Sequence, residues 1–449
     1  MNTGTTTNSV GLGRRELLRL GAAGLCGLGL PQLLELEARA GAAGPGAKRQ
    51  PRARSVILVW LNGGPSTIDM WDMKPDAPDD MRGEFRPVDT QAAGLRICEH
   101  LPRMAQVMDR VTVVRSLAHT IPDHNLATMF MTTGNRPTPV LQYPTLGSLV
   151  ARLVPPAAGT SPFISFPNRD LDRNAGVSGY LGPAYDPFDL EIRVTRADPI
   201  ETVVDTRGVT LPGGFTIDQL DDRDGLMRSF DQAFESADRK TEVVDGLDAF
   251  HRQALEILHS SRTREALDLG REKGSLRARY GQTLFGQGCL VARRLVEAGV
   301  RFVSVSSRSN WDTHVDNFKT LRTRMLPPLD QALASLIEDL DARGLLDSTI
   351  VYCAGEFGRT PKINPRGGRD HWARSMAVIL AGGGFKRGYA HGTTDAHGVA
   401  PASEPCTPDD IAATILFQLG IDPHQELQTA SGRPVQLFRD GNIIPNLIQ

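Results

Sequence analysis

The sequence lacks the charge imbalance that marks several classes of binding protein. Its 50 Lys and Arg residues face 52 Asp and Glu residues, for a net charge of −2. Nothing in the composition therefore points to nucleic acid or to an anionic membrane surface. Hydrophobic residues make up 40% of the 449 residues, which is enough for a globular core and argues against disorder. The length fits one large α/β domain with insertions.

Cysteine is scarce, and no two cysteines have the C-x-x-C spacing that a zinc ribbon needs. Beyond the N-terminal segment the cysteines lie far apart in the sequence, at Cys98, Cys289, Cys353 and Cys406. An oxidising compartment would allow one disulfide, but the sequence cannot pair its members. Four separate buried thiols are the interpretation that we prefer.

The N-terminal segment lacks a long uninterrupted apolar run, which argues against a stable membrane-spanning helix. It contains the pair Arg14 and Arg15, then a Gly- and Ala-rich apolar run, then an A-x-A pattern at residues 38–40. These features predict a twin-arginine signal peptide over residues 1–40, which is removed after the twin-arginine translocase exports the protein to the periplasm or beyond the cell. An N-terminal anchor helix is the alternative. The twin-arginine route carries folded proteins, which suits a protein that takes up a metal before export.

After a linker at residues 41–54, residues 55–449 are predicted to form one α/β domain. Continuous apolar and β-branched runs predict buried strands of a mainly parallel sheet. These runs cover residues 55–64, 110–117, 162–167, 299–307, 348–358 and 376–384. Amphipathic patterns predict helices on both faces of this sheet, at residues 289–299, 326–346 and 407–421. Residues 216–285 are polar and helical in pattern, and they predict a helical insertion beside the sheet or a lid.

Polar side chains follow nearly every predicted strand. Ligands of an open parallel sheet bind beyond the carboxyl ends of its strands, so these side chains are the candidates for a site. They are Asn62, Ser66, Asp69 and Asp72, then His119, Asp123 and His124, then Asp312, His314 and Asp316, and finally Glu356, Arg359, Thr360, Asp370 and His371. Carboxylates and imidazoles without a nearby thiolate suit a divalent metal. We expect one or two ions, zinc first, with manganese, iron, magnesium or calcium as alternatives.

The predicted metal ligands are Asp312, His314, Glu356 and His371, with Asp69 or His119 completing the set. Asp312 and His314 are alternate residues beyond a strand, so both can converge on one ion. Arg359 is a candidate clamp for a tetrahedral anion, because a guanidinium can bind such an oxyanion through two hydrogen bonds. The remaining histidines are weaker candidates, with surface or core positions expected for His251, His259 and His424 and an open assignment for His391 and His397.

Several segments resemble a known family. They are SVILVWLNGGPSTIDMWDMKPDAP from residue 55, WDTHVDNF from residue 311, the stretch from residue 326 to residue 364, GGRDHW from residue 367 and TPDDIAATILFQLGI from residue 407. Together they resemble the twin-arginine-exported bacterial proteins of domain-of-unknown-function family 1501, over nearly the whole chain after the signal. The order of the motifs is similar in turn to that of a remote branch of the alkaline phosphatase and sulfatase superfamily.

The second resemblance implies an alkaline-phosphatase-like fold and roles for particular residues. The segment at residues 124–137 is similar to the helix that carries the nucleophile of a sulfatase, which places His124 at the nucleophile position. DSTIVYCAGEFG implies Glu356 as a metal ligand, and GGRDHW implies His371 as the last ligand. The chain departs from the pattern in three places, because Asn62 replaces an Asp, His124 a Ser, Thr or Cys, and Phe357 a His. Histidine can attack phosphorus, bind metal or act as a general base, but it cannot form the usual serine or formylglycine adduct.

Three hypotheses follow for the function. The first is an exported, metal-dependent hydrolase of phosphate or sulfate esters, in which His124 and Arg359 act on a small anionic ester or on a sulfated or phosphorylated glycan. The second is a catalytically degenerate binding protein, which keeps the metal and recognises such a glycan or an exported partner. The third is another metal chemistry, such as that of a lyase or a transferase.

Overall fold

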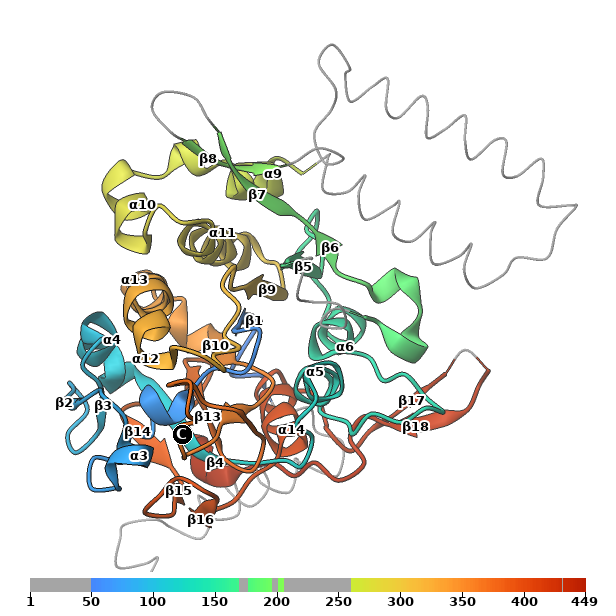
Figure 1. The fold of residues 1–449 in the computed structure, drawn as a ribbon. Coiled ribbons are helices and arrows are strands. Elements are labelled where there is room, and N and C mark those ends of the chain that lie inside the picture. The colour runs from blue at the N-terminus through green and yellow to red at the C-terminus, as the bar shows by residue number, and fades with distance from the viewer. Residues whose placement is uncertain (1–49, 169–176, 196–200, 206–259, 430) are drawn as a thin grey trace, which may run out of the picture. The chain divides into compact units, whose positions relative to one another are not determined.

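The computed structural model describes residues 50–168, 177–195, 201–205, 260–429 and 431–449 (Figure 1). The predicted signal peptide, most of the predicted linker and residues 216–259 of the predicted insertion lie outside these ranges. No helix in the described ranges is long and apolar enough to cross a membrane.

A sheet of eight strands forms the centre of the described domain (Figure 1). Its order is β14 (Tyr389–His391), β4 (Val111–Leu117), β13 (Met376–Ala381), β10 (Thr349–Ala354), β1 (Ser55–Trp60), β9 (Phe302–Ser306), β5 (Phe163–Phe166) and β6 (Phe188–Asp189). All neighbours run parallel except β13, which is antiparallel to both β10 and β4. All six strands predicted from apolar runs are present, and the sheet is mainly parallel as predicted.

Strand β1 shows why the sheet needs cover on both faces. All six of its side chains are buried, and alternate side chains point to opposite faces. Ile57 and Val59 join an apolar cluster with α4 (Pro102–Val107), α11 (Leu284–Ala298) and α13 (Leu326–Ala342). Val56, Leu58 and Trp60 join a second cluster with α5 (His124–Thr133), α6 (Leu146–Leu153) and α14 (Pro408–Gln418). Each buried Val, Leu or Ile contributes roughly 1.5–3 kcal/mol. The prediction of an α/β fold with helices on both faces is confirmed.

Local sequence signals account for the ends of the main helices. Thr407 and Asp410 form a capping box at the start of α14. Helix α13 stops just before Gly344, whose φ of +67° no other residue type adopts easily. Helix α5 begins at His124, because the side chain of Asp123 caps its first turn. This cap fixes the place at which His124 enters the site described below.

Smaller elements surround the sheet. They are α3 (Asp79–Arg82), α9 (Ser261–Leu267), α10 (Gly274–Tyr280), α12 (Asn317–Thr320) and the strand pairs β2–β3 (Pro87–Asp89, Arg96–Cys98), β7–β8 (Glu191–Thr195, Glu201–Asp205), β11–β12 (Gly358–Arg359, His371–Trp372), β15–β16 (Thr393–Thr394, Pro401–Ser403) and β17–β18 (Glu426–Gln428, Pro434–Gln436). Helices α9 and α10 lie in the described end of the predicted insertion. The four predicted thiols are free and buried, at Cys98, Cys289, Cys353 and Cys406.

Candidate metal centre

Residues from four distant segments meet at the carboxyl edge of the sheet. Asp312 and His314 lie in the loop after β9, Glu356 follows β10, and His124 follows β4. Strand β13 runs the opposite way, so the residues before it reach this edge rather than the residues after it. His371 lies in the segment that leads into β13. The antiparallel direction of β13 therefore places His371 beside the loop after β9.

Three potential ligand atoms form a triangle at this edge. Asp312 Oδ1 lies 3.0 Å from His314 Nε2 and 3.2 Å from His371 Nε2, and the two Nε2 atoms are 3.0 Å apart. Ligands of a tetrahedral zinc ion, bound at about 2.0–2.1 Å, stand roughly 3.3 Å apart. The observed spacing is close to that value. The three side chains are 23–32% exposed, so a small molecule can reach them.

Both histidines of the triangle are held through their other ring nitrogen. His314 Nδ1–H donates to Asp370 Oδ1 over 2.6 Å, and His371 Nδ1–H donates to the backbone carbonyl of Pro122 over 2.9 Å. When an ion is bound, the proton of each ring stays on Nδ1 and the lone pair of each Nε2 faces the ion; without an ion, a proton on His371 Nε2 can instead bond to Asp312. Metal-bound histidines are typically oriented by such partners. The hydrogen bond from His314 also lowers the pKa of Asp370, so this acceptor stays ionised.

A third histidine, His124, borders the triangle. Its Nδ1 lies 2.6 Å from Glu356 Oε1, and its Nε2 lies 3.4 Å from Asp312 Oδ2, the oxygen outside the triangle. One ligand atom each from His124, Asp312 and His371 lies within 4.8 Å of the others. The His124 ring is thus placed either to bind the same ion or to act beside it.

The charges in the cluster stabilise one another. Hydrogen bonds with Asp312 and Glu356 raise the pKa of His124 to about 9, although burial opposes this shift. Burial alone would raise the pKa of Asp312, but hydrogen bonds with His124 and His371, and the Arg359 guanidinium, hold it well below its usual range. The carboxylates therefore favour positive charge beside them, whether from a proton or from a cation.

Glu356 joins the site through His124. Its side chain is 2% exposed, and its Oε1 accepts hydrogen bonds from the Gly63 N–H at 2.8 Å and from the His124 ring. Its Oε2 is buried and has no hydrogen-bond partner among the described residues. An unpartnered buried carboxylate oxygen is costly, so this atom is suited to a cation. The geometry thus allows Glu356 to orient His124 and to offer its second oxygen as a ligand.

Arg359 does not face the opening of the site. Its side chain has no exposed surface, and its Nη2 donates to Asp312 Oδ1 over 2.5 Å. Its remaining acceptors are backbone carbonyls, those of Gly63, Gly64, Trp311 and Arg369. This arrangement contradicts the predicted role of Arg359 as a clamp for a substrate anion, because the guanidinium is buried and already engaged within the protein.

Asp69 and His119 stand behind the cluster rather than in it. Both oxygens of Asp69 accept hydrogen bonds from Arg369 at 2.8 Å, in an ion pair with almost no exposed surface. His119 Nε2 lies 2.8 Å from the backbone carbonyl of Glu356, and its Nδ1 accepts a hydrogen bond from a backbone N–H two residues later. Burial lowers the pKa of His119 to about 4, so its ring is neutral at pH 7. Both side chains therefore make hydrogen bonds within the protein, behind the metal-ligating cluster.

Two contributions are hard to recognise in the sequence. Asp370 is among the candidates, but no sequence pattern shows that it pairs with His314. Pro122 contributes a backbone carbonyl, which no side-chain pattern reveals. Among the weaker candidates, His251 and His259 lie outside the described residues, His391 is buried in β14, and His397 and His424 are exposed.

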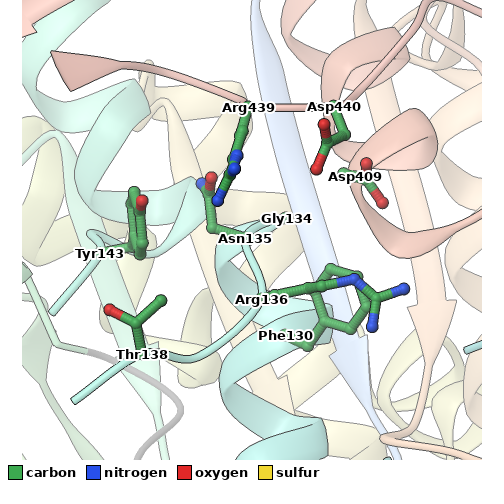
Figure 2. A pocket seen from close by; sticks show the side chains of 9 residues that line it. All are labelled: Phe130, Gly134, Asn135, Arg136, Thr138, Tyr143, Asp409, Arg439 and Asp440. Carbon is green, nitrogen blue, oxygen red and sulfur yellow. The ribbon is translucent and has the colours of Figure 1, made fainter. Parts of the chain in front are cut away.

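A small cavity lies at the other end of α5 (Figure 2). Its volume is about 60 Å³, and its lining carries both signs of charge, from Phe130, Gly134, Asn135, Arg136, Thr138, Tyr143, Asp409, Arg439 and Asp440. None of the predicted metal ligands lines it. We therefore place the candidate site at the metal-ligating cluster.

Comparison with known proteins gives a family and a set of similar folds. A family model described as "Protein of unknown function (DUF1501)" matches residues 53–448, and no curated protein matches the sequence. Similar solved structures include Ps i-CgsB in complex with k-i-k-neocarrahexaose, at 10% identity over 83% of this chain and 73% of that one, with a TM-score of 0.38. The PsFucS1 sulfatase from Pseudoalteromonas sp. matches at 11% identity, 87% and 70% coverage and a TM-score of 0.35. The phosphonate monoester hydrolase of Agrobacterium radiobacter matches at 11% identity, 88% and 77% coverage and a TM-score of 0.35.

Proposed function

Since the chain belongs to the family of proteins of unknown function DUF1501, we propose its function from its own site: it is an exported, metal-dependent hydrolase of phosphate or sulfate esters. The observation that carries this proposal is the triangle of Asp312 Oδ1, His314 Nε2 and His371 Nε2, with spacings of 3.0–3.2 Å. Three protein ligands in a partly exposed site leave room for water and for a substrate oxygen, as catalytic metal sites require.

The donor set fits a divalent ion, and zinc is the first choice. Two imidazoles, one carboxylate and an open position match catalytic zinc sites, and manganese or iron accept similar ligands. Magnesium and calcium prefer oxygen ligands and fit less well. A bound ion would polarise the ester and neutralise the charge that develops on its oxygens. Asp312, His314 and His371 would hold one ion, and a second would require the buried Oε2 of Glu356.

His124 is placed to accept a proton beside the metal. Its Nε2 lies 3.4 Å from Asp312 Oδ2, and Glu356, 2.6 Å from its Nδ1, would stabilise the imidazolium that forms. The carboxylates raise the pKa of His124 to about 9 in the metal-free site, so the ring can act as a general base only when a bound cation takes over the charge of that proton. His124 would then take the proton of the attacking water, and hydrolysis would need no serine or formylglycine nucleophile. Direct attack by His124 on phosphorus or sulfur is the alternative for the same geometry.

The proposal places the reaction in the periplasm or outside the cell. It does so because residues 1–40 contain the paired arginines, the apolar run and the A-x-A pattern of a twin-arginine signal. The twin-arginine translocase is the partner implied during export. The substrate class is a small anionic ester or a sulfated or phosphorylated glycan, because a bound divalent cation attracts negative charge.

A metal-containing binding protein is the second candidate. The observation that favours it is that a histidine, rather than a residue with a hydroxyl or thiol, begins α5, while the donors of Arg359 are used within the protein. In that case the same cluster would bind a sulfated or phosphorylated glycan, or an exported partner, without turnover.

One experiment separates the two candidates. The exported protein is purified, its metal content is measured, and aryl phosphates and aryl sulfates are assayed with and without a chelator. The hydrolase proposal expects bound metal together with turnover that the chelator and His371→Ala abolish, whereas His424→Ala, at an exposed histidine, serves as the control. Bound metal without turnover on any ester supports the binding protein. Protein that takes up no divalent metal refutes both.

A further inference from the structure

Five oxygen acceptors surround the guanidinium of Arg359. Nε donates to the Gly64 carbonyl over 2.7 Å, and Nη1 donates to the Arg369 carbonyl over 3.2 Å. Nη2 donates to the Trp311 carbonyl over 3.4 Å, to the Gly63 carbonyl and to Asp312 Oδ1 over 2.5 Å. These acceptors come from the loop after β1, the loop after β9 and the segment before β13. One side chain therefore joins three separate parts of the chain.

Two of these three parts supply the metal-ligating triangle, and the third holds Glu356. Asp312 belongs to the loop after β9, and Arg369 lies two residues before His371. Gly63 donates its N–H to Glu356 Oε1, and a Cβ on Gly63 would lie 2.3 Å from an Asn310 oxygen, so this loop packs directly against the loop of Asp312. The arginine thus lies where the parts of the site meet.

The contact with Asp312 also fixes the orientation of its carboxylate. The terminal torsion of an aspartate is broad, so an unrestrained carboxylate plane can turn away from the histidines. Arg359 Nη2 contacts Oδ1, the same atom that lies 3.0 Å from His314 and 3.2 Å from His371. The guanidinium therefore holds one oxygen of Asp312 toward the two histidines, where it completes the triangle.

We propose that Arg359 is a positioning residue of the metal centre, which fixes Asp312 and joins the three segments so that the ligand triangle forms before an ion binds. This inference rests on the proposed function, because it takes the triangle to be a metal site. A clamp for a substrate anion needs at least two N–H groups directed at the ligand. Arg359 directs its groups at four carbonyls and one carboxylate, behind the ligands and away from solvent.

The test is Arg359→Lys, which keeps the positive charge and loses the planar fork. A lysine nitrogen cannot reach carbonyls on opposite sides of the guanidinium, so Asp312 loses its fixed orientation while the local charge is unchanged. We expect the affinity for Zn²⁺, measured by competition with a chromophoric chelator, to fall about ten- to a hundredfold, as for other residues that orient metal ligands. At saturating Zn²⁺, kcat on an aryl ester should fall while KM stays the same.

Arg293→Lys is the matched control, because Arg293 is also buried and bonded to carboxylates, those of Glu272, Glu297 and Asp339. It lies in α11, away from the cluster, so it should lower stability and leave Zn²⁺ affinity unchanged. A measurement on the wild-type protein covers the case in which Arg359→Lys does not fold. Metal-free wild-type protein should not bind inorganic phosphate in a calorimetric titration, because Arg359 has no donor directed to solvent.

The outcomes separate this inference from the function on which it rests. Wild-type protein that binds no Zn²⁺ and hydrolyses no ester overturns both. Wild-type protein that does both, with an Arg359→Lys variant that keeps its Zn²⁺ affinity and has a raised KM, overturns the positioning role alone and restores the anion clamp. The positioning role is also overturned if the metal-free wild-type protein binds phosphate and a folded Arg359→Lys variant does not.

Discussion

Replacing Asp370 by Asn tests the metal centre at a residue that need not touch the ion. Asp370 Oδ1 accepts the Nδ1–H of His314 over 2.6 Å, and its side chain is 51% exposed. The amide of Asn can still accept this hydrogen bond, but it carries no charge. His314 would then be a weaker base and would be held less firmly in the tautomer whose Nε2 lone pair faces the triangle.

The expected loss can be worked out from this single contact. Partners that orient metal-bound histidines typically contribute about 10–100-fold to metal affinity, which corresponds to about 1.4–2.7 kcal/mol. Because the side chain is half exposed and outside the core, the free energy of unfolding should change by no more than about 0.5 kcal/mol. Zn²⁺ affinity by chelator competition and denaturant unfolding of the metal-free protein measure the two quantities separately.

Asp123→Asn is the control for charge. Asp123 is exposed, precedes His124 and caps α5, and Asn caps a helix as well as Asp does. It removes the same charge near the cluster without touching an imidazole, so Zn²⁺ affinity should stay within about twofold of wild type by the usual size of surface effects. An Asp370→Asn protein that binds Zn²⁺ as tightly as wild type would refute the assignment of His314 as a ligand oriented by Asp370.

Three further predictions concern the frame around the site. Arg293→Met should lower the free energy of unfolding by about 1–3 kcal/mol, because Glu272 and Asp339 each lose one arginine partner and keep another, Arg294 and Arg343; a loss below about 0.5 kcal/mol in denaturant unfolding would contradict this account. Gly368→Ala should lower the free energy of unfolding by about 1–3 kcal/mol and weaken Zn²⁺ binding, because the new Cβ would lie 2.1 Å from the backbone of His314. Gly274→Ala is the control: its Cβ would meet nothing within 4 Å, so neither the free energy of unfolding nor Zn²⁺ affinity should fall. Burial lowers the pKa of His119 to about 4 from 6.5, so the unfolded chain binds the proton more readily in this range. The contribution of His119 to the free energy of unfolding should therefore be most favourable above pH 6.5 and should decline as the pH drops toward 4, by up to roughly 3 kcal/mol. His119→Gln should remove this contribution in unfolding curves measured across that range.

The fold follows the sequence closely, because its main signals are local. The apolar run of β1 fills six consecutive buried positions, as a parallel strand between two helical layers requires. Thr407 caps α14, and Gly344 lies just past the end of α13. Such features depend on a few neighbouring residues, so they can be recognised without knowledge of the tertiary structure.

The candidate site was predictable in part. Asp312, His314 and His371 were predicted from the chemistry of their side chains and their places after strands, and the structure brings them within 3.2 Å of one another. Arg359 shows where this reasoning stops. An arginine near a predicted metal site looks the same in the sequence whether it points to solvent or into the protein, and only its five internal acceptors show that it faces inward.

By itself, the sequence determined the α/β class, the main strands and helices, the side chains able to hold a metal and the family to which the chain belongs. Only the tertiary structure decided which of those side chains meet. Strand β13 runs antiparallel, so His371 approaches the sheet edge from before its strand, and Asp69, from the loop after β1, turns away to pair with Arg369. The physical reason is range: strand and helix signals arise from neighbouring residues, whereas a ligand triangle depends on strand direction and on buried hydrogen bonds between residues as much as 300 positions apart.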